Sequence, residues 1–255
     1  MKKFALVLAL ALAMLLALPA FAAENVIPFP ENYDTTSSGA SSYENCGDHE
    51  DSVYFAHPDY YNMTSTDTLT ILTGFKTYQQ TTEYTCGPAS ALMVLYYFGE
   101  EGYDEMTIAE AANCLPGEGT TPQGLTAFFT GLGWEVTNNL SDGSENGEEE
   151  FDPDTFKAWV LENLTAGTPV IVDWIDWDGH FQVIIGYDTM GTDDHFGDDV
   201  LILADPYDTS DHLQDGYFTV NAERFFYMWH EGFSSDGDDI QVHPYVIARP
   251  AEQLQ

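Results

Sequence analysis

Apolar residues recur along this chain with two different periods, and the change between them predicts where helices and strands lie. From Thr68 onward, Leu69 and Ile71 alternate with polar residues, which is typical of a strand. Over 89–97 the apolar residues follow helical spacing, so we expect a helix with one apolar face that ends near Gly99. Shorter helices are predicted over 106–113, 121–129 and 154–164.

Strands dominate the second half of the sequence. Asp154 is expected to cap the helix before them, and the seven carboxylates of 142–154 predict a surface loop. Helices followed by strands indicate an α+β fold, in which a helical half packs on an antiparallel sheet. The predicted strands cover 134–136, 168–174, 180–187, 200–204 and 243–248, with a further helix over 221–229.

The N-terminus has the pattern of an export signal. Two lysines, an apolar run over 4–18 and the small residues of Ala20-Phe21-Ala22 predict a signal peptide over 1–22. We therefore expect a secreted or extracytoplasmic bacterial protein with no membrane span after cleavage. Residues 23–67 form an acidic N-terminal extension, draped on the domain or partly disordered, whose role stays open between propeptide, cap and linker. Residues 68–255 form one domain.

The charge of the chain is strongly one-sided. It has 43 acidic and 6 basic residues and a formal net charge of −37, which disfavours binding to nucleic acid and anionic membranes. Solubility, attraction of cationic peptides and divalent-cation binding at the acidic loops could each explain this excess. Solubility is favoured, because the acids are dispersed. The stretch 142–154 matches no EF-hand spacing, and the CGDHED of 46–51 lacks the paired spacing of a zinc site, so a solvated loop is favoured for both.

Three cysteines leave one thiol unpaired in an oxidising compartment. Cys46 and Cys114 could form a disulfide, or both could be free in a reducing one. The remaining thiol, Cys86, stands at the start of the helix predicted over 89–97. The N–H groups and dipole of a helix start favour a thiolate, which is the reactive form of cysteine. A buried structural cysteine is the alternative, and the polar residues 83–85 before it weaken that interpretation.

A thiol nucleophile needs a base and a group that orients the base. His180 precedes the apolar run of a predicted strand, and Asp205 follows the apolar run 200–204, so the two can end neighbouring strands. Acyl transfer also needs donors for the oxyanion. Gln80, six residues before Cys86, is the candidate, and Gln79 is the neighbour that could take its place.

Four blocks of sequence together resemble a known family. They are Gln80 with the CGPAS of 86–90, GTTPQGL at 119–125, GHFQVIIGYD at 179–188 and LADPYD at 203–208. Their order is similar to that of the bacteriocin-processing, double-glycine-leader peptidase-like family of papain-fold cysteine peptidases.

The resemblance implies a papain-like fold and specific roles for four residues. The helical half would bear the Cys86 helix, and the antiparallel sheet would bear His180 and Asp205. Cys86 would attack a peptide carbonyl, His180 would move the proton, Asp205 would orient the imidazole and Gln80 would help to bind the oxyanion. An acyl-enzyme would form without a cofactor, and peptides or proteins would be the substrates. The best-known members are attached to membrane transporters, whereas this chain carries an export signal.

Two other functions stay open at this level. One is a papain-fold acyltransferase, similar to a transglutaminase, which would pass the acyl group to an amine or thiol. The other is a non-catalytic exported protein that binds peptides or cations through its acidic loops.

Overall fold

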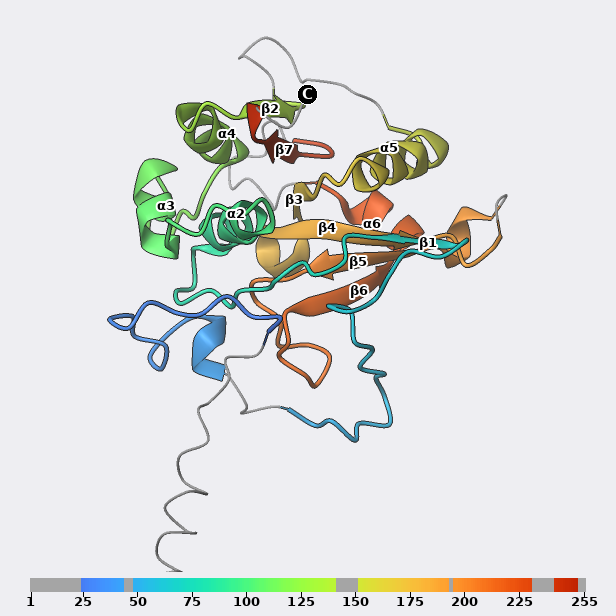
Figure 1. Ribbon diagram of the computed structural model, residues 1–255, viewed down its shortest axis with the longest axis horizontal. Coiled ribbons are helices and arrows are strands. Elements are labelled where there is room, and N and C mark those ends of the chain that lie inside the picture. Colours follow the sequence, from blue (N-terminus) through green and yellow to red (C-terminus); the bar gives the residue numbers. More distant parts are fainter. Residues whose placement is uncertain (1–23, 44–47, 141–150, 193–194, 231–240, 252–255) are drawn as a thin grey trace, which may run out of the picture.

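One antiparallel sheet organises the part of the chain that the structure describes. The computed structural model describes residues 24–43, 48–140, 151–192, 195–230 and 241–251. Seven strands within these ranges form the sheet, and helices lie against it, as Figure 1 shows. The predicted α+β class is therefore confirmed. The predicted signal peptide and most of the predicted acidic loop lie outside the described residues.

The central strand of the sheet begins at His180. This strand is β4 (His180–Asp188). β3 (Val170–Trp174) pairs with its first half, with Trp174 opposite His180. β1 (Leu69–Ile71) pairs with its second half, with Leu69 opposite Asp188. Every residue of the strand except Asp188 is buried, which explains its long apolar run. The strands in spatial order are β2 (Glu135–Asn138), β7 (Tyr245–Arg249), β3 (Val170–Trp174), β4 (His180–Asp188), β5 (Val200–Ala204) and β6 (Tyr217–Asn221), with β1 (Leu69–Ile71) paired to β4 beside β3.

Helices pack around the sheet and around one another. α2 lies against β4, α3 and α4 contact α2, and α4 also reaches β2 and β7 (Figure 1). α5 lies against β1, β4 and α6. The helices are α2 (Cys86–Tyr97), α3 (Glu105–Ala111), α4 (Pro122–Gly131), α5 (Pro153–Thr165) and α6 (Ala222–Met228), and the 3-10 turns are η1 (Ala40–Tyr43), η2 (Asp176–Asp178) and η3 (Phe196–Asp198).

The prediction that α2 is apolar on one face only is wrong. Every residue from Gly87 to Leu95 is buried, including the small ones. The reason is tertiary, because the sheet covers one side of α2 while α3 and α4 cover others. A helix covered in this way has no solvent-facing stripe over most of its length, and Cys86 lies at its open end.

Several element bounds differ from the predicted ones, and three of the local differences have a clear physical reason. α5 is capped by Asp152, whose carboxylate accepts from the backbone N–H of Thr155 at 2.8 Å, and Asp154 lies in the first turn instead. β7 starts at Tyr245 rather than at His243, whose φ of 57° does not fit a strand. β6 was not predicted, because this edge strand lies half exposed beside β5 and lacks a clear apolar pattern.

Residues 25–43, here called the strap, lie along the segment that leads to α2. The backbone of Thr77 exchanges hydrogen bonds with Asn25 and Ile27, at 2.9 and 2.8 Å, and the Ile27 side chain is buried in the core. Figure 1 shows the strap, in blue, close to the turn before α2. Within the described ranges, no helix combines the length and hydrophobicity that crossing a bilayer requires.

Candidate active site

Cys86 is the first residue of α2, and it is partly exposed while the body of the helix is buried. The preceding residue, Thr85, occupies the N-cap position, but its hydroxyl caps no backbone N–H group of the helix. The positive end of the helix dipole therefore lies at the thiol. This placement agrees with the predicted helix-start position.

Gly87 allows the GTTPQGL segment to approach the start of α2 closely. A Cβ atom at Gly87 would lie 2.9 Å from Cβ of Thr120, which is shorter than van der Waals contact. Pro88 is accommodated in the first helical turn, because it has no N–H group that would need a partner. The two residues after Cys86 thus bring α4 and its preceding loop against the nucleophile helix.

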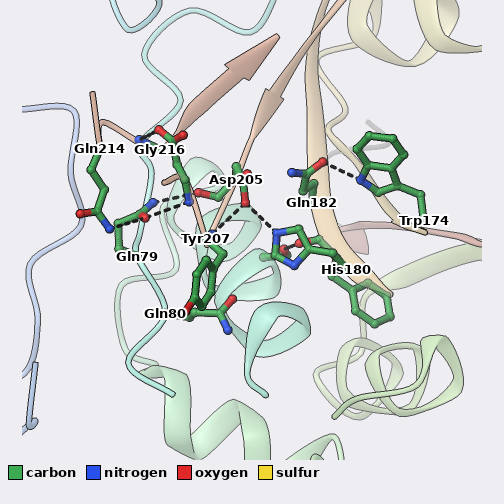
Figure 2. Close-up of polar contacts among 12 residues, drawn as sticks. Gln79, Gln80, Trp174, His180, Gln182, Asp205, Tyr207, Gln214 and Gly216 are labelled. Atoms are coloured by element: carbon green, nitrogen blue, oxygen red, sulfur yellow. Dashed lines mark hydrogen bonds and ion pairs between the residues drawn. The ribbon is translucent and has the colours of Figure 1, made fainter. Parts of the chain in front are cut away.

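His180 and Asp205 point toward each other from adjacent strands, as Figure 2 shows. Nε2 of His180 lies 2.7 Å from Oδ1 of Asp205, and both side chains are buried. The same carboxylate oxygen accepts from the backbone N–H of Tyr207 at 2.8 Å, which fixes its orientation. Ala204 pairs with Val183, so the end of β5 lies beside the start of β4, as expected from the sequence.

The environment of His180 favours its protonated form. Burial alone lowers the pKa of the imidazole, but the charge and hydrogen bond of Asp205, together with a hydrogen bond to Cys86, raise the pKa to about 10. Because Asp205 takes Nε2, the ring nitrogen left for the thiol is Nδ1. The arrangement suits an ion pair between a thiolate and an imidazolium.

Gln79 holds the loop that carries Asp205, a role that the sequence did not reveal. Its Nε2 donates to the main-chain oxygen of Asp205 at 2.8 Å. Its Oε1 accepts from the backbone N–H of Asp208 and from Nε2 of Gln214, both at 3.1 Å (Figure 2). Gln79 is therefore buried structural support for the acid rather than a second candidate for the oxyanion site.

Gln80 is also buried, and its surroundings differ from those of its neighbour. Its backbone N–H donates to the carbonyl of Pro206 at 2.9 Å, and its side-chain Nε2 donates to the carbonyl of Thr82 at 2.8 Å. Among the described residues Oε1 has no hydrogen-bond partner. One N–H of this amide stays available, so the oxyanion role of Gln80 remains a prediction.

Comparison with known proteins identifies the family. The sequence model of the Peptidase_C39 like family matches residues 72–231, which include all four predicted site residues. The chain belongs to this family. It is therefore a cysteine peptidase with the papain-like α+β fold.

A solved structure similar to this peptidase is that of the peptidase domain of Streptococcus ComA, a bi-functional ABC transporter involved in a quorum sensing pathway. The identity is 19%, the match covers 69% of this chain and 98% of that domain, and the TM-score is 0.43. No curated protein matches the chain.

Cys114 of this peptidase is a free thiol. Its Sγ donates to the carbonyl of Tyr84 at 3.2 Å, and burial raises its pKa. The disulfide considered from the sequence therefore does not engage Cys114, and Cys46 lies outside the described residues.

The loop after Asp205 is rich in buried carboxyls. Burial, followed by the charge of Asp205, raises the pKa of Asp208 to about 10, and burial raises the pKa of Asp215 to about 7. Within the described part of the chain no three metal-ligating side chains of the His, Cys, Asp or Glu type gather in one place. The divalent-cation site considered for the acidic loops thus has no such cluster to support it among these residues.

Proposed function

We propose that this peptidase hydrolyses peptide bonds with Cys86 as nucleophile, His180 as general base and acid, and Asp205 as the orienting carboxylate. The observation that carries the proposal is the buried 2.7 Å contact between His180 and Asp205, on an imidazole whose pKa is raised in part by Cys86, the first residue of α2. This order of contacts is the one that nucleophilic catalysis by a thiol requires.

The reaction begins with attack of the Cys86 thiolate on the scissile carbonyl carbon. The carbonyl electrons move to oxygen, and the oxyanion accepts hydrogen bonds from the N–H of Cys86 and from the amide of Gln80. When the C–N bond breaks, the imidazolium of His180 gives its proton to the leaving amine. The first product departs, and the acyl group remains on Cys86 as a thioester.

Water completes the cycle. Neutral His180 takes a proton from the water molecule, whose oxygen attacks the thioester carbon. Collapse of the second tetrahedral intermediate releases the carboxylic acid product and restores the Cys86 thiolate beside protonated His180. The proton that His180 gives to the leaving amine is replaced by the proton that it takes from water. The enzyme therefore ends the cycle in its starting protonation state.

Export of the peptidase is also part of the proposal. The pattern of 1–22 supports signal cleavage after Ala22, and residues 24–43 already belong to the folded enzyme through their contacts with the main domain. N-terminal sequencing of protein from the culture medium and from cells would test export. A protein that stays in the cells with Met1 intact would contradict it.

The test of hydrolysis uses the full chain and a library of internally quenched peptides. We expect cleavage by the wild type and a loss of at least about 10³-fold in the Cys86→Ala variant, since a missing nucleophile cannot be replaced by its neighbours. Cys86→Ser is the matched control, because it keeps the size of the side chain and replaces the thiol by a poorly nucleophilic hydroxyl. Full activity of Cys86→Ala would refute the proposal.

A second arm separates hydrolysis from acyl transfer. The same peptides are digested with and without an added primary amine, and the products are identified by mass spectrometry. We expect free carboxylic acids in both cases. Products that carry the amine as the main species would assign the enzyme to the acyltransferases.

A further inference from the structure

A buried carboxylate lies beneath the turn that leads into Cys86, and the proposed chemistry does not use it. Glu105 is the first residue of α3, and its side chain is fully buried. Its oxygens accept hydrogen bonds from the hydroxyl of Tyr78 at 2.9 Å, from the backbone N–H of Thr81 at 2.9 Å and from the Thr81 hydroxyl at 2.7 Å. The Thr85 hydroxyl donates to the same carboxylate.

These four donors all come from residues 78–85, and none comes from the helix that carries Glu105. Burial raises the pKa of Glu105, and the hydrogen bonds from Thr85, Thr81 and Tyr78 oppose that effect. Burial of a carboxyl group without hydrogen-bond partners costs stability. Glu105 therefore needs the donors of residues 78–85, and those donors need Glu105 as their acceptor. The turn 78–85 is in this sense folded around Glu105.

One consequence concerns the start of α2. A threonine at the N-cap normally accepts from a backbone N–H group of the first helical turn. The Thr85 hydroxyl is instead directed to Glu105 and to the Thr82 hydroxyl, and it makes no cap bond. The Thr85 side chain therefore does not occupy the backbone N–H groups beside Cys86, which lie where an oxyanion would form.

A second consequence concerns Gln80. The residues bound by Glu105 stand on both sides of it in the sequence, with Tyr78 held through its side chain and Thr81 through its backbone N–H and its hydroxyl. The path of the chain from Gln80 to Cys86 is therefore set by three anchor residues on one carboxylate.

We propose that Glu105 is a positioning residue of this peptidase. It holds the turn 78–85 so that the Cys86 thiol and the Gln80 amide face the same reacting carbonyl. The inference rests on the proposed function, since it gives a purpose to the placement of Cys86 and Gln80. Glu105 acts through hydrogen-bond geometry and touches neither substrate nor the reacting atoms.

Two variants separate geometry from charge. In Glu105→Gln the amide oxygen can accept from the Thr81 N–H and the Thr85 hydroxyl, while the amide nitrogen donates to the hydroxyl oxygens of Tyr78 and Thr81. In Glu105→Met the length is kept and all four bonds are lost. We expect Glu105→Gln to retain kcat within about 3-fold and Glu105→Met to lose about 30- to 100-fold in kcat with little change in KM, because a small misplacement of reacting groups is costly.

The readout that needs no substrate is the rate at which iodoacetamide alkylates Cys86, followed by mass spectrometry of the Cys86 peptide. We expect alkylation to slow about 10-fold in Glu105→Met and to stay near the wild-type rate in Glu105→Gln, because the thiolate depends on its position at the helix start.

Asp104→Ala is the matched structural control. Asp104 caps the same helix through the N–H of Thr107 at 2.9 Å, so its loss should lower the melting temperature and leave kcat unchanged. Should Glu105→Met fail to fold, Thr85→Val removes one anchor, and we expect a smaller loss of kcat, about 5- to 10-fold, with KM retained.

The outcomes distinguish this inference from the proposed function. If Glu105→Met, or Thr85→Val in its place, keeps wild-type kcat and alkylation while its melting temperature falls, Glu105 is structural only and the inference is wrong. If instead Cys86→Ala remains active, the proposed function fails, whereas slower alkylation in Glu105→Met would still show that Glu105 organises the turn.

Discussion

The two sides of the candidate active site are built in different ways. On the base side, His180 and Asp205 occupy the ends of adjacent strands, and the pairing of Val183 with Ala204 already places them together. On the nucleophile side, Gln80 and Cys86 are joined by an irregular turn, which side chains hold in place, with Glu105 at their centre. Repeated backbone hydrogen bonds secure the strand of His180, and one side chain, Gln79, holds the loop of Asp205, whereas on the nucleophile side the turn itself depends on several side chains.

This difference teaches which substitutions each side tolerates. A sheet spreads the cost of a change over many equivalent backbone bonds, while a side-chain network loses much of its order with one member. Single substitutions outside the catalytic residues should therefore disturb the nucleophile side more than the base side.

The largest expected effect comes from removal of the charge on the base side. Asp205→Asn should lower kcat by about 10³- to 10⁴-fold, because the imidazole loses the charge that stabilises and orients it. The fold should survive, since asparagine can still accept from the N–H of Tyr207. Steady-state kinetics on a quenched peptide measure this loss. An effect below 10-fold would show that orientation by the strand suffices.

The same variant tests the protonation of His180. Its pKa is raised from 6.5 to about 10 in the folded wild type, with Asp205 as the main cause that outweighs burial. The folded state thus holds a proton that the unfolded state loses first, so this contribution to stability is complete below pH 6.5 and disappears as the pH rises toward 10. Urea unfolding from pH 6 to 9 should show that decline in the wild type and a weaker one in Asp205→Asn.

The next largest effects are expected from the two adjacent glutamines, of which Gln80 lies on the nucleophile side and Gln79 supports the base side. Gln80→Ala should lower kcat by about 10²-fold, as expected for loss of one oxyanion donor, and should cost less stability than Gln79→Ala, because its buried side chain makes one hydrogen bond instead of three. Gln79→Ala should mainly destabilise the protein, by about 1–3 kcal/mol, because it leaves partners of the Asp205 loop unpaired. Kinetics and thermal unfolding of both variants separate the roles. Equal kcat in Gln80→Ala and wild type would leave the oxyanion to backbone N–H groups alone.

A substitution that disturbs the contact between the strap and the turn 78–85 should have a smaller effect on kcat, and it should act on the nucleophile side only. The N–H of Ser41 donates to the carbonyl of Gln80 at 3.1 Å, and a Cβ at Gly39, whose φ is +67°, would lie 2.5 Å from that carbonyl oxygen. Gly39→Ala should therefore cost about 2–4 kcal/mol of stability through strain and overlap, and reduce kcat several-fold.

Gly74→Ala is the matched control for this substitution. Gly74 has a φ of +75°, but no neighbouring atom lies within 4 Å of its added Cβ. It should cost about 1–2 kcal/mol from backbone strain alone, with unchanged kcat. Chemical denaturation and kinetics compare the pair, and equal kcat values for the two variants would mean that the strap does not influence the turn.

The smallest expected effect on activity comes from Asp208, in the loop that follows Asp205, where a substitution should change stability only. The pKa of Asp208 is raised to about 10, mainly by burial, so the folded state resists its ionisation and loses stability as the pH rises from 3.8. Asp208→Asn keeps an acceptor for the N–H of Gly216, which now lies 2.9 Å from the carboxylate. We expect the stability of the variant relative to wild type to rise steadily between pH 5 and pH 8, measured by urea unfolding. A pH-independent difference would contradict this expectation.

Much of the fold followed from local patterns. The helix at Cys86, the strand that begins at His180 and the α+β class depend on periodicity and on residues at element ends, which act within a few positions of the chain. The full burial of α2 could not be predicted, since it depends on what packs against the helix. The edge strand β6 was missed because its apolar pattern is weak where solvent reaches it.

By itself, the sequence determined which residue types stand at which element ends, and so where a thiol, an imidazole and a carboxylate could meet. Only the tertiary structure separated Gln79 from Gln80, because two adjacent identical residues differ solely in where the chain directs their side chains. It also showed that Glu105 is buried against the turn 78–85, where it accepts hydrogen bonds from three residues of that turn. The physical reason is that burial and hydrogen-bond partners come from distant parts of the chain, and no local pattern records them.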